Sequence, residues 1–152
     1  MPDPLSVSNS SGLIALESIG RLDLLHRLYG TVTIPDAVAQ ECGMALPGWL
    51  TVQAVQNRGL VQSLRMNLGP GESEAIALAS ETSAIRVILD DKKARRTARQ
   101  LGLPVTGLLA VLLQAKHRGF VSSIREVIAE LTAVQFFVSE NLIEETLRRA
   151  GE

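Results

Sequence analysis

The sequence of 152 residues has few aromatic side chains, one cysteine and almost no net charge. With Cys42 alone, the chain can form neither an internal disulfide nor a zinc site built from cysteines, which is typical of a reducing compartment. Aromatic residues make up 3% of the chain, so the core must consist of Leu, Ile, Val and Ala. Because the formal net charge is −1, binding of nucleic acid would need a local basic patch.

Long apolar runs are also missing. No stretch approaches the length of a transmembrane helix, and the N-terminus has no basic segment followed by an apolar one, as a secretion signal would have. We therefore expect a cytoplasmic protein with no membrane segment. Apolar residues still make up 46% of the chain and charged residues 20%, which excludes disorder. The length, without a linker or internal repeat, favours a single domain over residues 1–152.

Strand-like and helix-like patterns alternate along the chain. Short apolar runs predict strands at 5–8, 31–34, 60–66, 85–89 and 103–105, and a short extended segment at 136–138. Helical spacing predicts helices between Ser11 and Gly20, from about Pro35 to Cys42, and at 21–29, 49–57, 72–81, 92–101, 108–118, 122–132 and 140–150. In the first of these, Leu13, Ile14 and Leu16 are expected on the buried side. This order predicts an α/β fold whose mostly parallel sheet carries helices on both faces.

A pair of carboxylates, Asp90 and Asp91, directly follows the apolar run 87–89 and precedes a basic helix. Carboxylates at the end of a buried parallel strand occupy the usual ligand position of an open α/β sheet. The competing interpretation is that the two residues cap the helix and favour its dipole. We favour the ligand interpretation, because further acidic residues are expected to face the same region.

Three other polar residues are candidates for the same site. Asn9 ends the first strand, and Glu41 lies on the apolar stripe of its helix. Glu72 shares a helical face with Ala75, Ile76 and Ala79, so it is expected to point along the packed face, with Glu74 as the competing choice. Their alternative roles are a helix cap for Asn9, an exposed residue for Glu41 and a first-turn acid for Glu72.

Clustered carboxylates require a cation, and oxygen ligands suit Mg²⁺ or Mn²⁺. Such an ion can activate water and stabilise the charge that develops on a phosphodiester during cleavage. The pattern therefore predicts a metal-dependent nuclease. One face of the basic helix carries Lys92, Arg95, Arg96 and Arg99. This face could bind RNA phosphates or could simply be exposed to solvent, and both interpretations stay open.

Five segments together resemble PIN domains, and in particular the branch related to VapC-type toxin ribonucleases. They are residues 7–16 (VSNSSGLIAL), 34–41 (IPDAVAQE), 68–79 (LGPGESEAIALA), 89–96 (LDDKKARR) and 102–107 (GLPVTG). The resemblance covers nearly the whole chain. It implies a three-layer α/β/α sandwich, usually dimeric, that cleaves RNA with Mg²⁺ or Mn²⁺.

The resemblance also implies roles for individual residues. Glu41, Glu72 and Asp91 would be catalytic, Asp90 and Asn9 would complete the metal ligands, and Thr106 would bind a water or a phosphate. Asn9 departs from the family, which has an acid there, because its amide oxygen can bind a cation but brings no charge. Loss of one negative charge weakens binding of a divalent ion.

Two hypotheses about function follow. The first is a metal-dependent endoribonuclease, the toxin of a toxin–antitoxin pair, acting as a homodimer with a cognate antitoxin as partner. The second is a PIN-like domain whose catalysis has lapsed and which binds protein or RNA. A nucleotide-binding domain is disfavoured, since no glycine-rich phosphate loop follows the first strand.

Overall fold

A five-stranded parallel sheet forms the centre of the protein, in a computed structural model that describes residues 4–152. The strand order is β3-β2-β1-β4-β5, and every neighbouring pair is parallel. The strands are β1 (Ser6–Ser8), β2 (Val32–Ile34), β3 (Leu50–Val52), β4 (Arg86–Ile88) and β5 (Val105–Thr106). The predicted α/β class is confirmed, and the sheet is parallel throughout.

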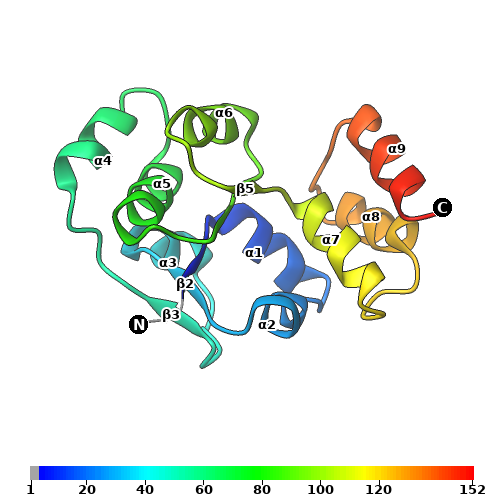
Figure 1. The fold of residues 1–152 in the computed structure, drawn as a ribbon. Coiled ribbons are helices and arrows are strands. Elements are labelled where there is room, and N and C mark those ends of the chain that lie inside the picture. The colour runs from blue at the N-terminus through cyan, green and yellow to red at the C-terminus, as the bar shows by residue number, and fades with distance from the viewer. Residues whose placement is uncertain (1–3) are drawn as a thin grey trace.

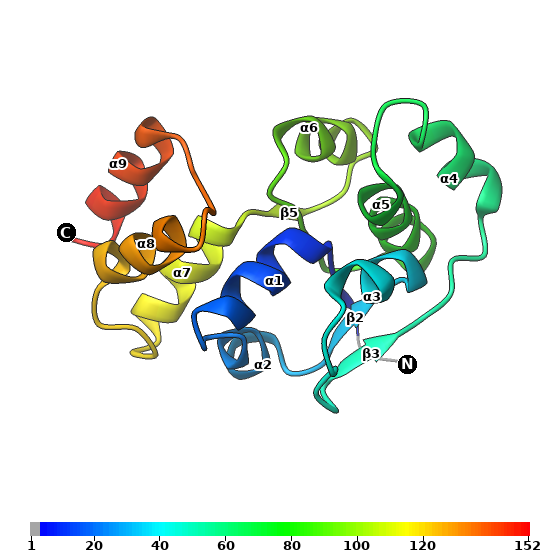
Figure 2. The same ribbon diagram turned by 180° about the vertical axis from the view of Figure 1, so that it is seen from behind.

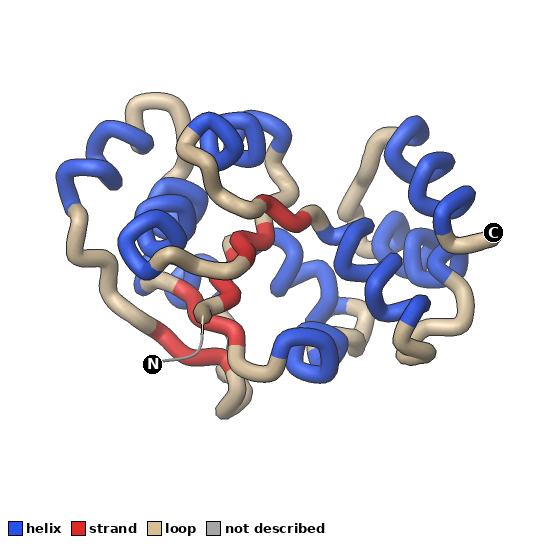
Figure 3. The backbone as a smooth tube through the Cα atoms, in the orientation of Figure 1, coloured by secondary structure: helices blue, strands red, loops and turns tan. Residues whose placement is uncertain are grey.

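The described residues form nine helices, and helices lie on both sides of the strands (Figure 3). Helix α5 packs directly on the central strands β1 and β4, and α2 packs on β2. Helices α7, α8 and α9 gather at one end of the molecule, and α4 lies at the other (Figure 1). The helices are α1 (Ser10–Ser18), α2 (Asp23–Tyr29), α3 (Asp36–Cys42), α4 (Arg58–Leu64), α5 (Pro70–Thr82), α6 (Lys92–Gln100), α7 (Leu108–His117), α8 (Ile124–Ala133) and α9 (Glu140–Arg149).

The central strand β1 is buried on both faces, although two of its three residues are serines. Val7 lies opposite Val87 of β4 and has no exposed surface. The two serines have partners: the Ser6 hydroxyl accepts a hydrogen bond from Arg86 Nη1 (2.7 Å), and the Ser8 hydroxyl donates to the Asn9 carbonyl (2.9 Å). Because buried polar groups need such partners, the short strand tolerates serine at the centre of the sheet.

The predicted helix at 49–57 is wrong, because residues 50–52 form strand β3. This edge strand pairs with β2, with Val32 opposite Leu50, and its three residues are too few for a periodic pattern. Backbone pairing with β2 therefore decides the conformation, as often happens for short apolar segments.

The predicted strand at 60–66 is also wrong, because helix α4 covers most of it. Asn57 caps this helix by accepting a hydrogen bond from the Leu60 amide (3.1 Å). Val61 and Leu64, three residues apart, are buried on one face. The N-cap residue and this spacing together favour a helix over a strand.

Two smaller expectations also fail. The segment 136–138 forms no strand, and Phe137 is 68% exposed. Ile14 is 39% exposed, whereas Leu13 and Leu16 are fully buried as expected. The apolar face of α1 is thus narrower than the sequence indicates.

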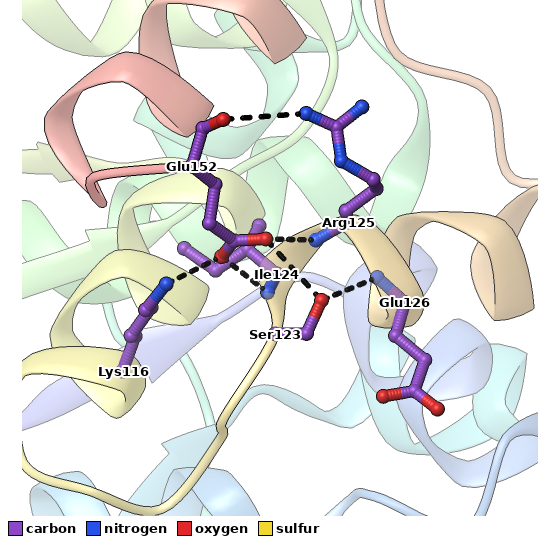
Figure 4. A network of polar contacts seen from close by, with 6 residues as sticks. All are labelled: Lys116, Ser123, Ile124, Arg125, Glu126 and Glu152. Carbon is purple, nitrogen blue, oxygen red and sulfur yellow. Dashed lines mark hydrogen bonds and ion pairs between the residues drawn. The ribbon is translucent and has the colours of Figure 1, made fainter.

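The three C-terminal helices are joined by the carboxylate of Glu152 (Figure 4). Its Oε2 accepts hydrogen bonds from Lys116 Nζ (2.8 Å) and the Ile124 amide (2.7 Å), and Oε1 accepts from the Arg125 amide (3.2 Å) and the Ser123 hydroxyl (3.2 Å). These partners hold the pKa of Glu152 at about 2, mainly through Lys116.

In the described residues, no helix is long and apolar enough to cross a bilayer.

Candidate functional site

The carboxyl ends of the central strands lead directly into helices. Strand β1 continues through Asn9 into α1, β4 continues through Asp90 and Asp91 into α6, and β5 continues through Gly107 into α7. Helix α3 contacts both α1 and α5, and Figure 2 shows it beside these two helices. The positive ends of several helix dipoles therefore lie along the edge of the sheet where the candidate carboxylates are found.

Asp90 is half-buried, and one of its two carboxylate oxygens is completely buried. Its Oδ1 accepts a hydrogen bond from the Leu108 amide (2.9 Å), the first amide of α7, and its Oδ2 lies against Gly12 of α1. Oδ2 is buried and has no hydrogen-bond partner among the described residues. Burial raises the pKa of Asp90, and the Leu108 amide, the charge of Arg95 and the Ser11 hydroxyl oppose this effect.

Asn9 occupies the N-cap position of α1 but its side chain does not cap the helix. The Asn9 Nδ2 donates to the Ser11 hydroxyl (3.3 Å), and Oδ1 is buried without a partner in the described part of the chain. The Asn9 amide also donates to the Ile88 carbonyl (3.0 Å), which fixes the residue beside β4. The side-chain oxygen Oδ1 is therefore available to a ligand. If Asn9 capped the helix, this oxygen would instead accept a hydrogen bond from a backbone amide of α1.

Glu41 and Glu72 approach each other from α3 and α5. Burial raises the pKa of Glu41, and the negative charge of Glu72 raises it further. The Ser10 hydroxyl donates to Glu41 Oε2 (3.5 Å) at the start of α1. Glu72 Oε2 accepts from the Gly69 amide (3.1 Å), so Glu72 also caps its own helix, while its Oε1 has no hydrogen bond within residues 4–152. The two carboxylates repel each other, and a cation would relieve the repulsion.

The expectation that Glu72 lies on the packed face of its helix, and Glu74 does not, is wrong. Glu74 is 8% exposed, and its carboxylate accepts hydrogen bonds from the Ala37 amide (3.1 Å) and from Arg58 Nη1 (3.1 Å). Helix α5 is buried almost all round its first two turns, so it has no single apolar stripe. These contacts commit Glu74 to α3 and α4.

Asp91 has the geometry of a helix cap. Its Oδ2 accepts a hydrogen bond from the Ala94 amide (2.8 Å) at the N-terminus of α6, and the residue is exposed. The two neighbouring aspartates therefore differ in environment, and Asp90 is the one with a buried oxygen that has no partner in the described residues. The ligand and catalytic roles named from the sequence, for Asp91 as for Glu41 and Glu72, stay predictions.

The basic face of α6 divides into two parts. Lys92, Arg96 and Arg99 line an open depression of about 360 Å³ together with Gln100. Arg95 instead turns back and donates from Nη1 to the Asp90 carbonyl. Thr106 is half-buried in β5, where its carbonyl accepts from the Leu89 amide (3.1 Å).

The sequence reasoning missed the small residues in the first turns of the helices. Ser10, Ser11 and Gly12 surround the carboxylates at the start of α1, and Gly71 lies against Glu41 at the start of α5. The Ser-Ser-Gly segment after a strand was available as an indication, but its only apparent role was to cap a helix. Helical spacing shows which residues share a face of one helix, and it does not show which residues of another helix contact a carboxylate.

The donor groups at this edge suit a divalent cation in chemical type. Asn9 Oδ1 and Asp90 Oδ2 are buried oxygens that have no partner among residues 4–152, and oxygen atoms are the preferred ligands of Mg²⁺. No three His, Cys, Asp or Glu side chains lie close enough together, within the described residues, to form a metal cluster on their own. Mg²⁺ commonly uses only one or two carboxylates and retains several waters, so the donors present still fit it.

Comparison with known proteins agrees with this architecture. Residues 5–152 match the DUF3368 family, described as a PIN domain. Neither a curated protein nor a solved structure matches the chain. Because the match covers nearly all of the sequence, the chain belongs to the DUF3368 family of PIN domains.

Proposed function

We propose that the protein is an endoribonuclease that depends on Mg²⁺ or Mn²⁺. PIN domains generally include nucleases and typically use divalent metals. The observation that carries the proposal is the pair of buried oxygens, Asn9 Oδ1 and Asp90 Oδ2, that have no partner among residues 4–152. Such atoms are costly unless a ligand satisfies them, and they lie at the ligand-binding edge of the sheet.

Asp90 and the amide oxygen of Asn9 would hold the ion directly. Glu41 and Glu72 would act through its water ligands, because no three acidic side chains of the described residues lie close enough together to bind one ion directly. The exposed Asp91, with one oxygen outside its helix cap, would support them. When bound, the ion would supply Lewis-acid stabilisation and a more acidic water. The first turns of α1 and α7 hold Asp90 through their helix dipoles and through the Leu108 amide (2.9 Å).

The basic face of α6 would bind the RNA backbone beside this site. Lys92, Arg96 and Arg99 make no hydrogen bond or ion pair with their side chains in the described residues, and they line one depression. The helix that carries them starts next to Asp90 and Asp91, so a bound strand would pass close to the carboxylates. Thr106, at the end of β5, is a further candidate for contact with a phosphate or a water.

A cleavage assay tests the proposal. The purified chain is incubated with single-stranded and structured RNAs in Mn²⁺, and the products are resolved on denaturing gels. We expect Asp90→Asn to abolish cleavage and Asp91→Asn, which preserves the helix cap, to reduce it. Asp23→Asn, at the exposed start of α2, removes a charge elsewhere and should cleave as the parent does. Cleavage by Asp90→Asn at the parent's rate would refute the proposal.

We also propose that the enzyme is the toxin of a toxin–antitoxin pair, as a homodimer, in the cytoplasm. The support is the sequence resemblance to the branch of PIN domains related to VapC. The test is co-expression with a small protein encoded next to this chain, which should bind it and inhibit cleavage. If no such neighbour is encoded, the toxin role is refuted but not the nuclease activity.

A second candidate function is binding without catalysis. It is favoured by Asn9, which removes one negative charge, and by the lack of a three-acid cluster in the described residues. Calorimetric titration with Mn²⁺ separates the two, because a lapsed site would show no saturable binding. RNA binding without cleavage in Mn²⁺ would then support the binding module.

A further inference from the structure

Gly12 and Gly71 differ from the other glycines of the described chain, because a Cβ atom at either position would clash with a neighbouring side chain. A Cβ on Gly12 would lie 2.8 Å from Asp90 Oδ2, and a Cβ on Gly71 would lie 2.8 Å from Glu41 Cδ and closer still to its oxygens. At every other glycine of the described chain, a Cβ would stay at least 3.4 Å from its nearest neighbour. At these two glycines, the space that a methyl group would need is therefore occupied by a carboxylate that we propose to act at the metal site.

Backbone conformation does not require glycine at either position. Gly12 is the third residue of α1, Gly71 is the second residue of α5, and neither has a positive φ. Alanine is more favourable than glycine in helical conformation. What glycine provides here is space beside the helix backbone.

The carboxylates that fill this space lie beside the first turns of helices. The Gly71 amide and the Ser10 hydroxyl both favour the ionised form of Glu41 and thereby lower its pKa. Asp90 is held between Gly12 and the Leu108 amide, with Oδ2 buried and unpartnered within residues 4–152. Close approach to the backbone thus sets the position of both side chains.

We infer that Gly12 and Gly71 are positioning residues, which let the Asp90 and Glu41 carboxylates settle against α1 and α5 in the arrangement that binds the metal ion. The inference rests on the proposed function for the ion. The contact between each carboxylate and its glycine does not depend on that function, and it can be tested separately.

The contact is tested by unfolding four proteins in EDTA: the parent, Gly71→Ala, Glu41→Ala and the double variant. Gly71→Ala should lower Tm when Glu41 is present, because the methyl group displaces the carboxylate. It should raise Tm in the Glu41→Ala background, where alanine only favours the helix. The same change of Tm in both backgrounds would overturn the inference. If Gly71→Ala does not fold, recovery of folding in the double variant supports the contact, and its failure overturns it.

The positioning role is tested by calorimetric titration with Mn²⁺. Gly71→Ala and Gly12→Ala should each weaken binding at least tenfold. Gly59→Ala, inside α4, is the matched control, because its Cβ would lie 3.7 Å from the nearest atom and should leave the affinity unchanged. Adding Glu41→Asp to Gly71→Ala should recover part of the affinity, since the shorter side chain withdraws from the methyl group.

The outcomes separate this inference from the proposed function. Unchanged Mn²⁺ affinity in both glycine variants would overturn the positioning role while the proposed function stood. A parent without saturable Mn²⁺ binding would refute the proposed function and with it a role in placing metal ligands, whereas the unfolding experiment would still show whether Gly71 determines where Glu41 lies.

Discussion

The carboxylate of Glu74 joins the start of α3 to Arg58 of α4. Its Oε1 accepts from the Ala37 amide and its Oε2 from Arg58 Nη1, each at 3.1 Å. Glu74 is 8% exposed, whereas the Arg58 side chain is 57% exposed. Glu74 therefore holds α3 and α4 against α5, and the role of Glu72 in the site stays a prediction.

The first prediction follows from these contacts. Glu74→Ala should lower the free energy of unfolding by about 1 kcal/mol, because the half-buried Ala37 amide loses its acceptor. Arg58→Ala should cost only about 0.5 kcal/mol, because its side chain is exposed to solvent. Urea unfolding measures both. A loss of Mn²⁺ affinity in folded Glu74→Ala, at unchanged Glu72, would instead assign Glu74 to the metal site.

The second prediction concerns the buried charge of Asp90. Without metal at pH 7, Asp90→Asn should raise the free energy of unfolding by about 1–3 kcal/mol, because it removes a desolvated carboxylate and keeps an acceptor for Leu108. Since the pKa of Asp90 is raised in the folded state, its charge destabilises the fold above the unfolded pKa. Lowering the pH through the folded pKa should therefore remove the difference between Asp90→Asn and the parent. Unfolding in EDTA as a function of pH measures it.

The third prediction concerns Asn9, which stands where the PIN family has an acidic residue. Asn9→Asp should tighten Mn²⁺ binding about tenfold or more and increase cleavage, because a second carboxylate faces the ion. Without metal, the same variant should be less stable than the parent, since two buried carboxylates then lie at one edge. Asn57→Asp adds the same charge at the exposed cap of α4 and should change neither property. Calorimetry and thermal unfolding with and without EDTA provide the readouts.

The fourth prediction concerns Glu152 and acid unfolding. Because its pKa falls from 4.5 to about 2 on folding, Glu152 stabilises the fold above pH 4.5, and this contribution is lost as the pH falls toward 2. Glu152→Gln should therefore lower Tm at neutral pH and flatten the fall of Tm over that pH range. Glu140→Gln, at an exposed position of α9, serves as the control. Equal acid sensitivity in parent and Glu152→Gln would contradict the assignment.

The fifth prediction concerns RNA binding along α6. A plot of log affinity against log salt concentration should become shallower by roughly 0.7 for each of Lys92, Arg96 and Arg99 changed to alanine, as for one phosphate contact to a single strand. Lys93→Ala is the matched control, because this lysine on the same helix does not line the depression. Filter binding at several salt concentrations, without divalent ions, checks the slopes. If the Lys93 variant changes the slope as much, the three cations form no defined surface.

The sequence was sufficient to predict the α/β class and most of the alternation of strands and helices. The apolar residues around Val7 and Val87 predict a strand at each place, and Asn9 and Asp90 follow these strands. The pairing of the two strands with each other is known only from the structure. The secondary structure predicted for residues 50–64 was wrong. Strand β3 has only three residues, which is too few for a periodic pattern, and its conformation depends on pairing with β2.

The side-chain roles at the site were harder to predict, for a physical reason. Asp90 and Asp91 are adjacent in sequence, but one is buried against Gly12 and the other caps α6. Similarly, Glu74 is buried because α4 packs on that part of α5 and supplies Arg58. Helical phase gives the direction of a side chain along one element, and it cannot give the partner that another element brings.

The pairing of β1 with β4 has a consequence for the order of folding. Ser6 lies opposite Arg86 in this pair, so the two strands that carry Asn9 and Asp90 meet only after a long loop has closed. During synthesis, β1 and β2 can emerge and pair while Asp90 has not yet been made. The edge that is proposed to bind metal therefore forms late, and a nascent chain remains without a complete site until β4 docks and α7 supplies the Leu108 amide.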